Sequence, residues 1–190
     1  MPVEIEAKMA VADFAPVRAQ LTERGGRLIG RYFEINSFFD RPEHALLKAD
    51  KGLRIRIKRN LDTQQEQYII TFKGPKQRGP LKSREELELN VGNATDAQKL
   101  LEGLGYQKVL LFEKRRESYD FEGCEIELDE LPLLGTFVEV EGPDEKSVLR
   151  ARELLGLGDR DMIRTGYASM VAPLLDKHGD QCRELRFGSV

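Results

Sequence analysis

Cysteine is scarce in this chain of 190 residues, which contains only Cys124 and Cys182. Two distant cysteines are too few for a disulfide framework, and their spacing is not that of a zinc site. The first residues show no basic segment followed by an apolar run, so the sequence predicts no signal peptide. No stretch approaches about 18 consecutive apolar residues, so we expect no membrane span. These absences predict a cytoplasmic location.

Histidine is equally rare, and the chain lacks the common phosphate-binding loop. His44 lies in a polar segment and His178 lies near the end of the chain, so we expect neither to act as a general base. No Gly-x-x-x-x-Gly-Lys-Ser/Thr sequence is present, and Gly74-Pro75 and Gly79-Pro80 indicate turns instead. Any phosphate chemistry must therefore use another arrangement of residues.

Charged residues, in contrast, make up 33% of the chain. Lysine and arginine total 30 and aspartate and glutamate total 33, so the net charge is −3. This near balance does not favour general binding to nucleic acid or to a membrane surface. It leaves open where so many charges of both signs lie.

The pattern of hydrophobic residues predicts one domain of the α+β class. Eight β-rich segments are expected at residues 3–9, 28–39, 53–58, 67–73, 83–91, 109–121, 125–129 and 137–141. Helices are expected near residues 13–24, 95–104, 144–155 and 164–175. Short turns join most of the strands, which favours an antiparallel sheet. Residues 176–190 show no clear period and are expected to form a disordered tail.

The first strand shows a pattern that other strands repeat. Its apolar residues occupy odd positions, whereas Glu4, Glu6 and Lys8 occupy even positions and share one face. A single strand of this kind is typical of a solvated edge. Acidic pairs recur, however, at Glu4/Glu6, Glu86/Glu88, Glu127/Asp129 and Glu139/Glu141, and basic pairs at Arg54/Arg56 and Lys114/Arg116, with Lys8, Lys73 and Arg84 in addition.

Two arrangements would explain this alternation. Charged faces that point outward would leave an ordinary sandwich or barrel core, but solvent-facing strands usually also carry Thr, Ser and Gln. Charged faces that point inward would line a closed eight-stranded barrel, whose interior holds side chains or one small ligand. Buried charges are costly unless they are paired or used. A polyphosphate with divalent cations uses both signs, because carboxylates hold Mg²⁺ or Mn²⁺ and cationic side chains bind phosphate. We favour the inward arrangement.

The segment Glu4-Ile5-Glu6-Ala7-Lys8 resembles the ExExK signature of the CYTH superfamily, the triphosphate tunnel metalloenzymes. The resemblance covers residues 1–175 and includes, in the expected order, Leu53-Arg54-Ile55-Arg56, Phe72-Lys73-Gly74, Arg84-Glu85-Glu86-Leu87-Glu88, Lys114-Arg115-Arg116, Glu127-Leu128-Asp129 and Phe137-Val138-Glu139-Val140-Glu141. The segments Phe72-Lys73-Gly74-Pro75-Lys76 and Ser83-Arg84-Glu85-Glu86 are most similar to the class IV adenylyl cyclase branch.

The resemblance implies a closed antiparallel tunnel of eight strands with flanking helices, and a reaction on a triphosphate that depends on Mg²⁺ or Mn²⁺. It implies metal ligands at Glu4, Glu6, Glu139 and Glu141, and phosphate ligands at Lys8, Arg54, Arg56, Lys73, Lys114 and Arg116. Asp129 and Glu127 become candidates for a second metal or for base chemistry, and Lys8 also belongs to the catalytic set. Arg84 is expected to pair with Glu86 and Glu88 or to touch substrate.

Three functions fit this resemblance. A class IV adenylyl cyclase would convert ATP to cyclic AMP and pyrophosphate, and we favour it. A triphosphatase would use the same ligands to hydrolyse inorganic triphosphate, thiamine triphosphate or a nucleoside triphosphate. A polyphosphate-binding module without turnover is the third, although the complete ligand set argues against it. Similarity to dimeric members also makes a homodimer an expectation.

Overall fold

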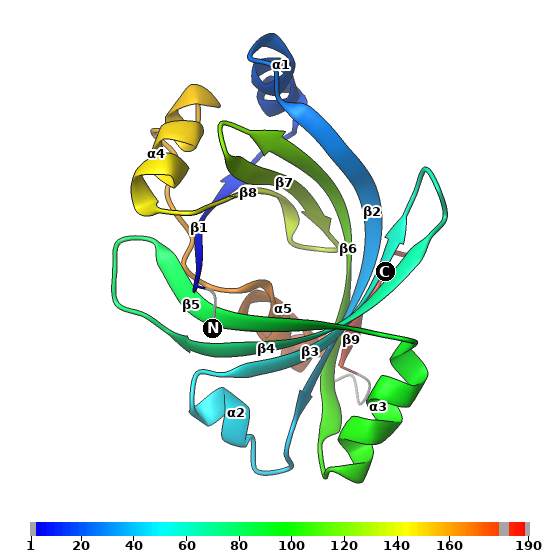
Figure 1. Cartoon of the computed structure of the whole chain (residues 1–190). Coiled ribbons are helices and arrows are strands. Elements are labelled where there is room, and N and C mark those ends of the chain that lie inside the picture. The colour runs from blue at the N-terminus through cyan, green and yellow to red at the C-terminus, as the bar shows by residue number, and fades with distance from the viewer. Residues whose placement is uncertain (1–2, 179–182, 189–190) are drawn as a thin grey trace.

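The computed structural model describes residues 3–178 and 183–188 and contains a closed β-barrel (Figure 1). Eight antiparallel strands follow the order β2-β3-β4-β5-β1-β8-β7-β6, and β6 also pairs with β2 to close the sheet. The strands are β1 (Val3–Val11), β2 (Arg27–Asp40), β3 (Gly52–Asn60), β4 (Glu66–Lys76), β5 (Lys82–Val91), β6 (Gln107–Phe121), β7 (Cys124–Leu131) and β8 (Gly135–Gly142). The predicted fold, an antiparallel barrel of eight strands with flanking helices, is confirmed.

Five helices lie around the barrel in the described part of the chain: α1 (Ala15–Glu23), α2 (Ala45–Lys48), α3 (Ala94–Gly103), α4 (Glu145–Leu154) and α5 (Tyr167–His178). The α3 helix begins at Ala94, one residue earlier than expected, because Asn93 caps it by accepting a hydrogen bond from the Asp96 amide at 2.7 Å. None of the helices in the described ranges is both long and apolar enough to cross a membrane.

The short helix α2 lies in a segment that the sequence predicts as a polar connector. The buried carboxylate of Asp40 organises this segment by accepting backbone hydrogen bonds from Arg41, Leu46 and Leu47 at 2.7–2.9 Å. His44 and Asp50, on either side of the helix, have left-handed backbone conformations with φ of 57° and 52°. These contacts hold α2 over one end of the barrel.

The hydrophobic core lies outside the barrel wall, beneath the helices. Ala7 and Met9 of β1 are buried in a cluster that includes Val138 and Val140 of β8 and Val148 of α4. The odd residues of β1 therefore point outward into this core. Because side chains alternate along a strand, the even residues point into the barrel.

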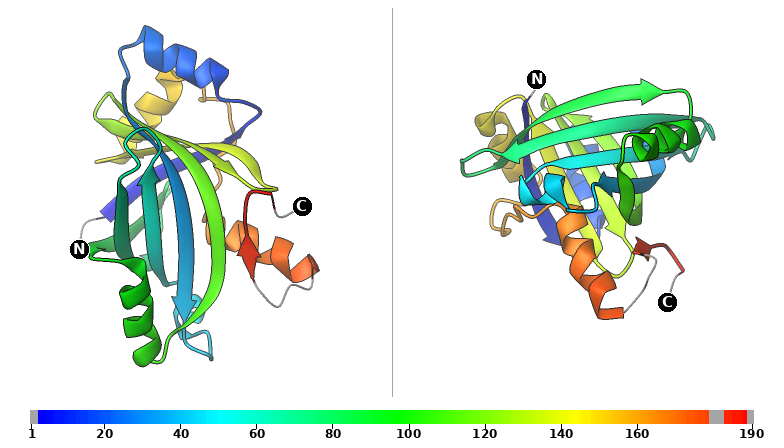
Figure 2. Two further views of the ribbon diagram at one scale, coloured as in Figure 1. Left: turned by 90° about the vertical axis from the view of Figure 1, so that its right-hand side faces the viewer. Right: turned by 90° about the horizontal axis from the view of Figure 1, so that it is seen from below.

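The α5 helix and the last described segment complete the wall beside β6. The β7 strand pairs with residues 115–121 of β6. Leu111 and Phe112 of β6 pair instead with the short parallel strand β9 (Glu184–Leu185) (Figure 2). The α5 helix packs against Leu110, Phe112 and Phe137 through an apolar cluster. This differs from the expected disordered tail at 176–190, because α5 continues to residue 178 and residues 183–188 lie against β6. Cys182 lies outside the described residues.

Candidate active site

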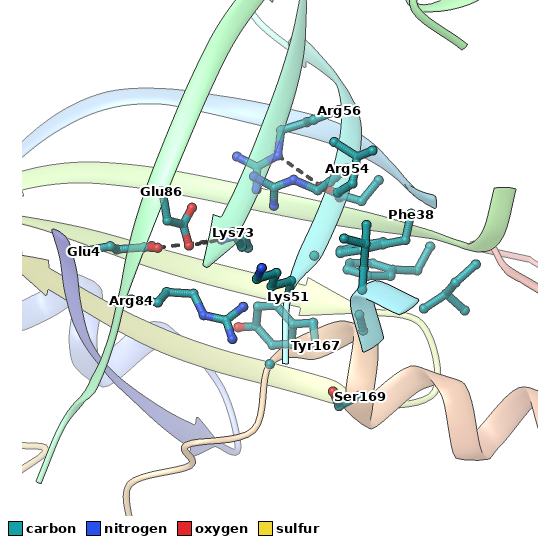
Figure 3. Close-up of a pocket in the computed structure, with 18 of the residues that line it drawn as sticks. Glu4, Phe38, Lys51, Arg54, Arg56, Lys73, Arg84, Glu86, Tyr167 and Ser169 are labelled. Atoms are coloured by element: carbon teal, nitrogen blue, oxygen red, sulfur yellow. Dashed lines mark hydrogen bonds and ion pairs between the residues drawn. The ribbon is translucent and has the colours of Figure 1, made fainter. Parts of the chain in front are cut away.

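The charged strand faces meet in one cavity of about 1050 Å³ inside the barrel, with lining residues from all eight strands (Figure 3). The predicted site residues that line it are Glu4, Glu6, Lys8, Arg54, Arg56, Lys73, Arg84, Lys114, Arg116, Glu127, Glu139 and Glu141. Asp129 is completely buried and is not part of the lining. Helices and apolar strand faces surround the barrel, so the charges lie in the region that the inward arrangement requires.

One side of the cavity is an acidic wall formed by β1 and β8. The register places Glu6 opposite Glu141 and Lys8 opposite Glu139. Burial, together with the nearby carboxylates of Glu4 and Glu127, raises the pKa of Glu141 to about 9. Burial and the charge of Glu139 likewise raise the pKa of Glu6. Carboxylates that repel one another and offer only oxygen donors fit a hard divalent cation such as Mg²⁺ or Mn²⁺.

Lys8 crosses from the acidic wall toward α5. Its ammonium lies 3.1 Å from Glu139, donates a hydrogen bond to the Thr165 carbonyl at 3.0 Å, and lies 3.9 Å from the centre of the Tyr167 ring. The Ile163 amide also donates to the Lys8 carbonyl at 2.8 Å. The segment that leads into α5 therefore fixes the position of Lys8.

A second side of the cavity is cationic and is formed by β3 and β4. The Arg54 guanidinium donates to Thr71 at 3.0 Å, and burial together with the charge of Arg56 lowers the pKa of Arg54 to about 10. Burial and the charge of Arg54 also lower the pKa of Lys73, which pairs with Glu86 (Figure 3). Cations that repel one another in this way fit a bound polyanion.

A second acidic cluster lies on β7 and β8 around Arg116. One carboxylate oxygen from each of Glu127, Asp129 and Glu139 lies within 4.8 Å of the others. The Arg116 guanidinium contacts all three, with Nη2 at 2.5 Å from Asp129 and 2.8 Å from Glu139. Lys114 adds a contact of 3.2 Å to Asp129. Arg116 and Lys114, which the sequence predicts as phosphate ligands, thus neutralise carboxylates in this structure.

The structure changes the interpretation of Arg84. The sequence predicts that Arg84 pairs with Glu86 and Glu88 or touches substrate, but its guanidinium lies 3.4 Å from Asp50. Asp50 also accepts from Lys76 at 2.6 Å. The expected pairing with the two glutamates is therefore wrong, because β5 directs Arg84 toward the loop after α2.

Sequence reasoning missed several residues inside the barrel. Glu34 is completely buried and lies 3.4 Å from Arg56 and 3.3 Å from Lys114. Burial disfavours the charge of the Glu34 carboxylate, and these two cations favour it. Lys82 lies directly opposite Glu6, and its ammonium is 2.8 Å from that carboxylate. Lys82 has the same parity as Arg84, Glu86 and Glu88 on its strand, which is the signal that could have identified it, whereas Arg27 and Arg31 of β2 have the opposite parity to Glu34.

The cavity continues into an apolar region between α2 and α5. Phe38, Leu46, Leu47, Leu110 and Ala168 line this part, and Figure 3 shows Phe38 on the opposite side of the cavity from Glu4. The charged and apolar regions form one continuous space. It can therefore accept a polyanion joined to an organic group.

Comparisons with known proteins agree with this geometry. Residues 2–167 match the CYTH domain. A Methanocaldococcus jannaschii protein that is provisionally named an adenylate cyclase is 30% identical over 139 residues, which cover 73% of this chain and 76% of that protein. The adenylate cyclase CyaB of Aeromonas hydrophila is 34% identical over 107 residues, which cover 56% of this chain and 51% of that protein.

Solved structures extend the similarity to nearly the whole fold. The PH1819 protein of Pyrococcus horikoshii is 31% identical, with a TM-score of 0.75 over 92% of this chain and 99% of that one. A Hippeastrum protein, provisionally an adenylyl cyclase and described as having a dominant triphosphatase activity, shares the fold with a TM-score of 0.64 and 19% identity over 95% of this chain and 97% of that one. With its matching domain, charged tunnel and closed barrel, this chain belongs to the CYTH domain family.

Proposed function

We propose that this protein is a divalent-metal-dependent class IV adenylyl cyclase that converts ATP to cyclic AMP and pyrophosphate. The observation that carries the proposal is the single cavity in which an acidic wall faces a cationic wall. A triphosphate with a divalent cation is complementary to both walls. Two relatives that bear the name adenylate cyclase, one of them provisionally, support the choice of reaction.

The acidic wall is the proposed metal site. Glu4, Glu6, Glu139 and Glu141 would hold Mg²⁺ or Mn²⁺, and Glu127 with Asp129 offers a second position. A bound divalent cation supplies positive charge to phosphate oxygens and lowers the pKa of a coordinated hydroxyl. Burial and the neighbouring carboxylates raise the pKa values of Glu6 and Glu141, which supports this assignment.

The cationic wall is the proposed phosphate site. Arg54, Arg56 and Lys73 would bind the triphosphate oxygens, and Lys8 would approach from the acidic side. Bound in this way, the triphosphate would leave the ribose 3′-hydroxyl in line with the α-phosphorus. A bond forms from the 3′-oxygen to the α-phosphorus while the bond from that phosphorus to the bridging oxygen breaks, and pyrophosphate leaves. The same cations stabilise the charge on the leaving group.

The hydroxyl proton must pass to a base beside the cavity. Glu127 lines the cavity, and burial together with the charge of Asp129 raises the pKa of Glu127 to about 8 against the opposing charge of Arg116. A carboxylate with a pKa near the working pH is well matched to proton transfer. We therefore assign Glu127 the base, with the completely buried Asp129 orienting Arg116 beside it.

The apolar region between α2 and α5 favours a nucleotide over inorganic triphosphate. Phe38, Leu46 and Leu110 line it next to the charged walls, and inorganic triphosphate would leave it without an apolar partner. A nucleobase would bury its faces against these side chains. A triphosphatase is the second candidate, because it needs the same ligands and differs only in directing water to the terminal phosphorus.

Product analysis tests the proposal. ATP, inorganic triphosphate and thiamine triphosphate are supplied separately with Mg²⁺ or Mn²⁺, and we expect cyclic AMP and pyrophosphate from ATP. Orthophosphate from inorganic triphosphate, without cyclic AMP from ATP, would show a triphosphatase instead.

We also propose that the protein forms a homodimer through the outer sheet face, where Leu87 and Leu89 are 43% and 57% exposed. Light scattering of the purified protein tests this proposal separately.

A further inference from the structure

Lys82 lines the cavity beside the proposed metal site. It begins β5 directly opposite Glu6, is only 9% exposed, and its ammonium lies 2.8 Å from a Glu6 carboxylate oxygen. Glu4 and Glu139 are the other carboxylates whose charges act on it. An ammonium ion therefore pairs directly with one of the four carboxylates that we assign to the divalent cation and feels the charge of two others.

Lys82 differs from Lys8, the other ammonium in this region. Lys8 lies 3.1 Å from Glu139 and 3.9 Å from Glu6, but the Thr165 carbonyl and the Tyr167 ring, neither of which belongs to the proposed metal site, also hold it in place. Among residues 3–178 and 183–188, Glu6 forms the one ion pair of Lys82. Loss of Glu6 to a metal would leave the Lys82 ammonium free to turn on its flexible stem.

We propose that Lys82 is the resident counterion of the metal site, which it occupies until a divalent cation and a triphosphate bind together. The inference rests on the proposed function. A divalent cation bound by Glu6 would repel the ammonium at this distance, so metal alone binds against an opposing charge. With a triphosphate present, Lys82 exchanges Glu6 for a phosphate oxygen inside the same cavity. Metal and triphosphate binding are thereby coupled.

Mn²⁺ binding to the substrate-free protein tests this role without measuring activity. Free Mn²⁺ is followed by electron paramagnetic resonance in the wild type, Lys82→Met, Lys82→Arg and Lys76→Met. Lys76→Met is the matched control, because Lys76 also lines the cavity and carries the same charge but pairs with Asp50. We expect Lys82→Met to bind Mn²⁺ at least about tenfold more tightly than the wild type. Lys82→Arg and Lys76→Met should bind as the wild type does.

Nucleotide binding supplies the second measurement. The dissociation constant of a non-cyclising ATP analogue, with methylene between the α- and β-phosphorus atoms, is measured with saturating Mn²⁺ and with a chelator. Lys82→Met should weaken binding about tenfold with Mn²⁺ and much less with the chelator, because Lys82 meets phosphate only after the metal releases it. A lysine with a purely structural role would weaken both equally.

The outcomes separate this inference from the proposed function. Equal Mn²⁺ affinity in the wild type and Lys82→Met overturns the inference alone, as does weaker binding in a Lys82→Met protein with wild-type circular dichroism. A Lys82→Met protein that does not fold overturns it too, since the lysine would then be a structural requirement. The absence of Mn²⁺ binding in every form overturns the proposed metal site together with the inference.

Discussion

The two acidic clusters of the tunnel are similar in composition and differ in the counterions that hold them. Around Arg116, the charges of Asp129 and Glu127 raise the pKa of the guanidinium well above its ordinary value, although burial acts to lower it. On the β1–β8 wall, burial and neighbouring carboxylates raise the pKa values of Glu6 and Glu141. One guanidinium shared by three carboxylates thus holds the Arg116 cluster together, whereas separate ammonium groups, those of Lys8 and Lys82, balance the β1–β8 wall. An ammonium on a flexible stem is more easily displaced, so we expect the divalent cation at the β1–β8 wall.

Removal of Arg116 should have the largest effect on stability. Arg116→Met leaves Glu127, Asp129 and Glu139 without their shared counterion, and we expect a loss of about 3–5 kcal/mol in the free energy of unfolding. Urea denaturation measures this. Arg115→Gln is the matched control on the same strand, because its pair with Glu130 is 53% and 41% exposed and should contribute less than about 1 kcal/mol. A similar small loss in both variants would contradict an internally neutralised cluster.

Neutralising the β1–β8 wall should instead affect catalysis. Glu6→Gln or Glu4→Gln removes a proposed metal ligand, and we expect turnover to fall at least about a hundredfold, or roughly 2.7 kcal/mol in the barrier. The fold should persist, because glutamine keeps the size of each side chain and one acceptor oxygen. Initial rates over a Mn²⁺ titration and circular dichroism measure the two effects. Full activity in either variant would show that the metal ligands are assigned wrongly.

The apolar region offers a smaller, more selective test. Phe38→Ala should raise the KM for ATP about tenfold and leave the affinity for inorganic triphosphate unchanged, because only the nucleotide reaches this part of the cavity. Steady-state kinetics and competition with inorganic triphosphate measure both values. An equal loss of affinity for ATP and for inorganic triphosphate would mean that Phe38 supports the charged walls and does not bind the nucleobase.

The pH dependence of stability should show the smallest effect, and each cluster contributes to it through one carboxyl group. The pKa values of Glu127 and Glu141 are raised to about 8 and about 9, so the folded protein holds protons there that the unfolded chain has already released. The metal-free protein should therefore lose at least about 1 kcal/mol of unfolding free energy between pH 6 and pH 9. Denaturation with a chelator and with Mg²⁺ measures this, and Mg²⁺ should stabilise more at pH 9. Stability that rises over this range without metal would contradict the raised values.

Strand alternation predicted much of the site, because it depends only on neighbouring residues. Glu4, Glu6 and Lys8 share a face with period two, and the structure places all three in the cavity. The same parity did not identify Lys82, because the predicted strand began one residue later, at Ser83. Glu34 was missed because it has no acidic partner two residues away, unlike the acidic pairs on the other strands.

The amino-acid sequence by itself determined which residues share a strand face and where most of the strands and helices lie, since both follow from local periodicity. Tertiary structure decided which of those charges neutralise each other. Arg84 pairs with Asp50, Arg116 with three carboxylates, and Lys82 with Glu6, and each pair joins residues on different strands or loops. It also decided that α5 and β9 continue the wall past β7. Register and barrel closure set these partners, because they bring together positions that are distant along the chain.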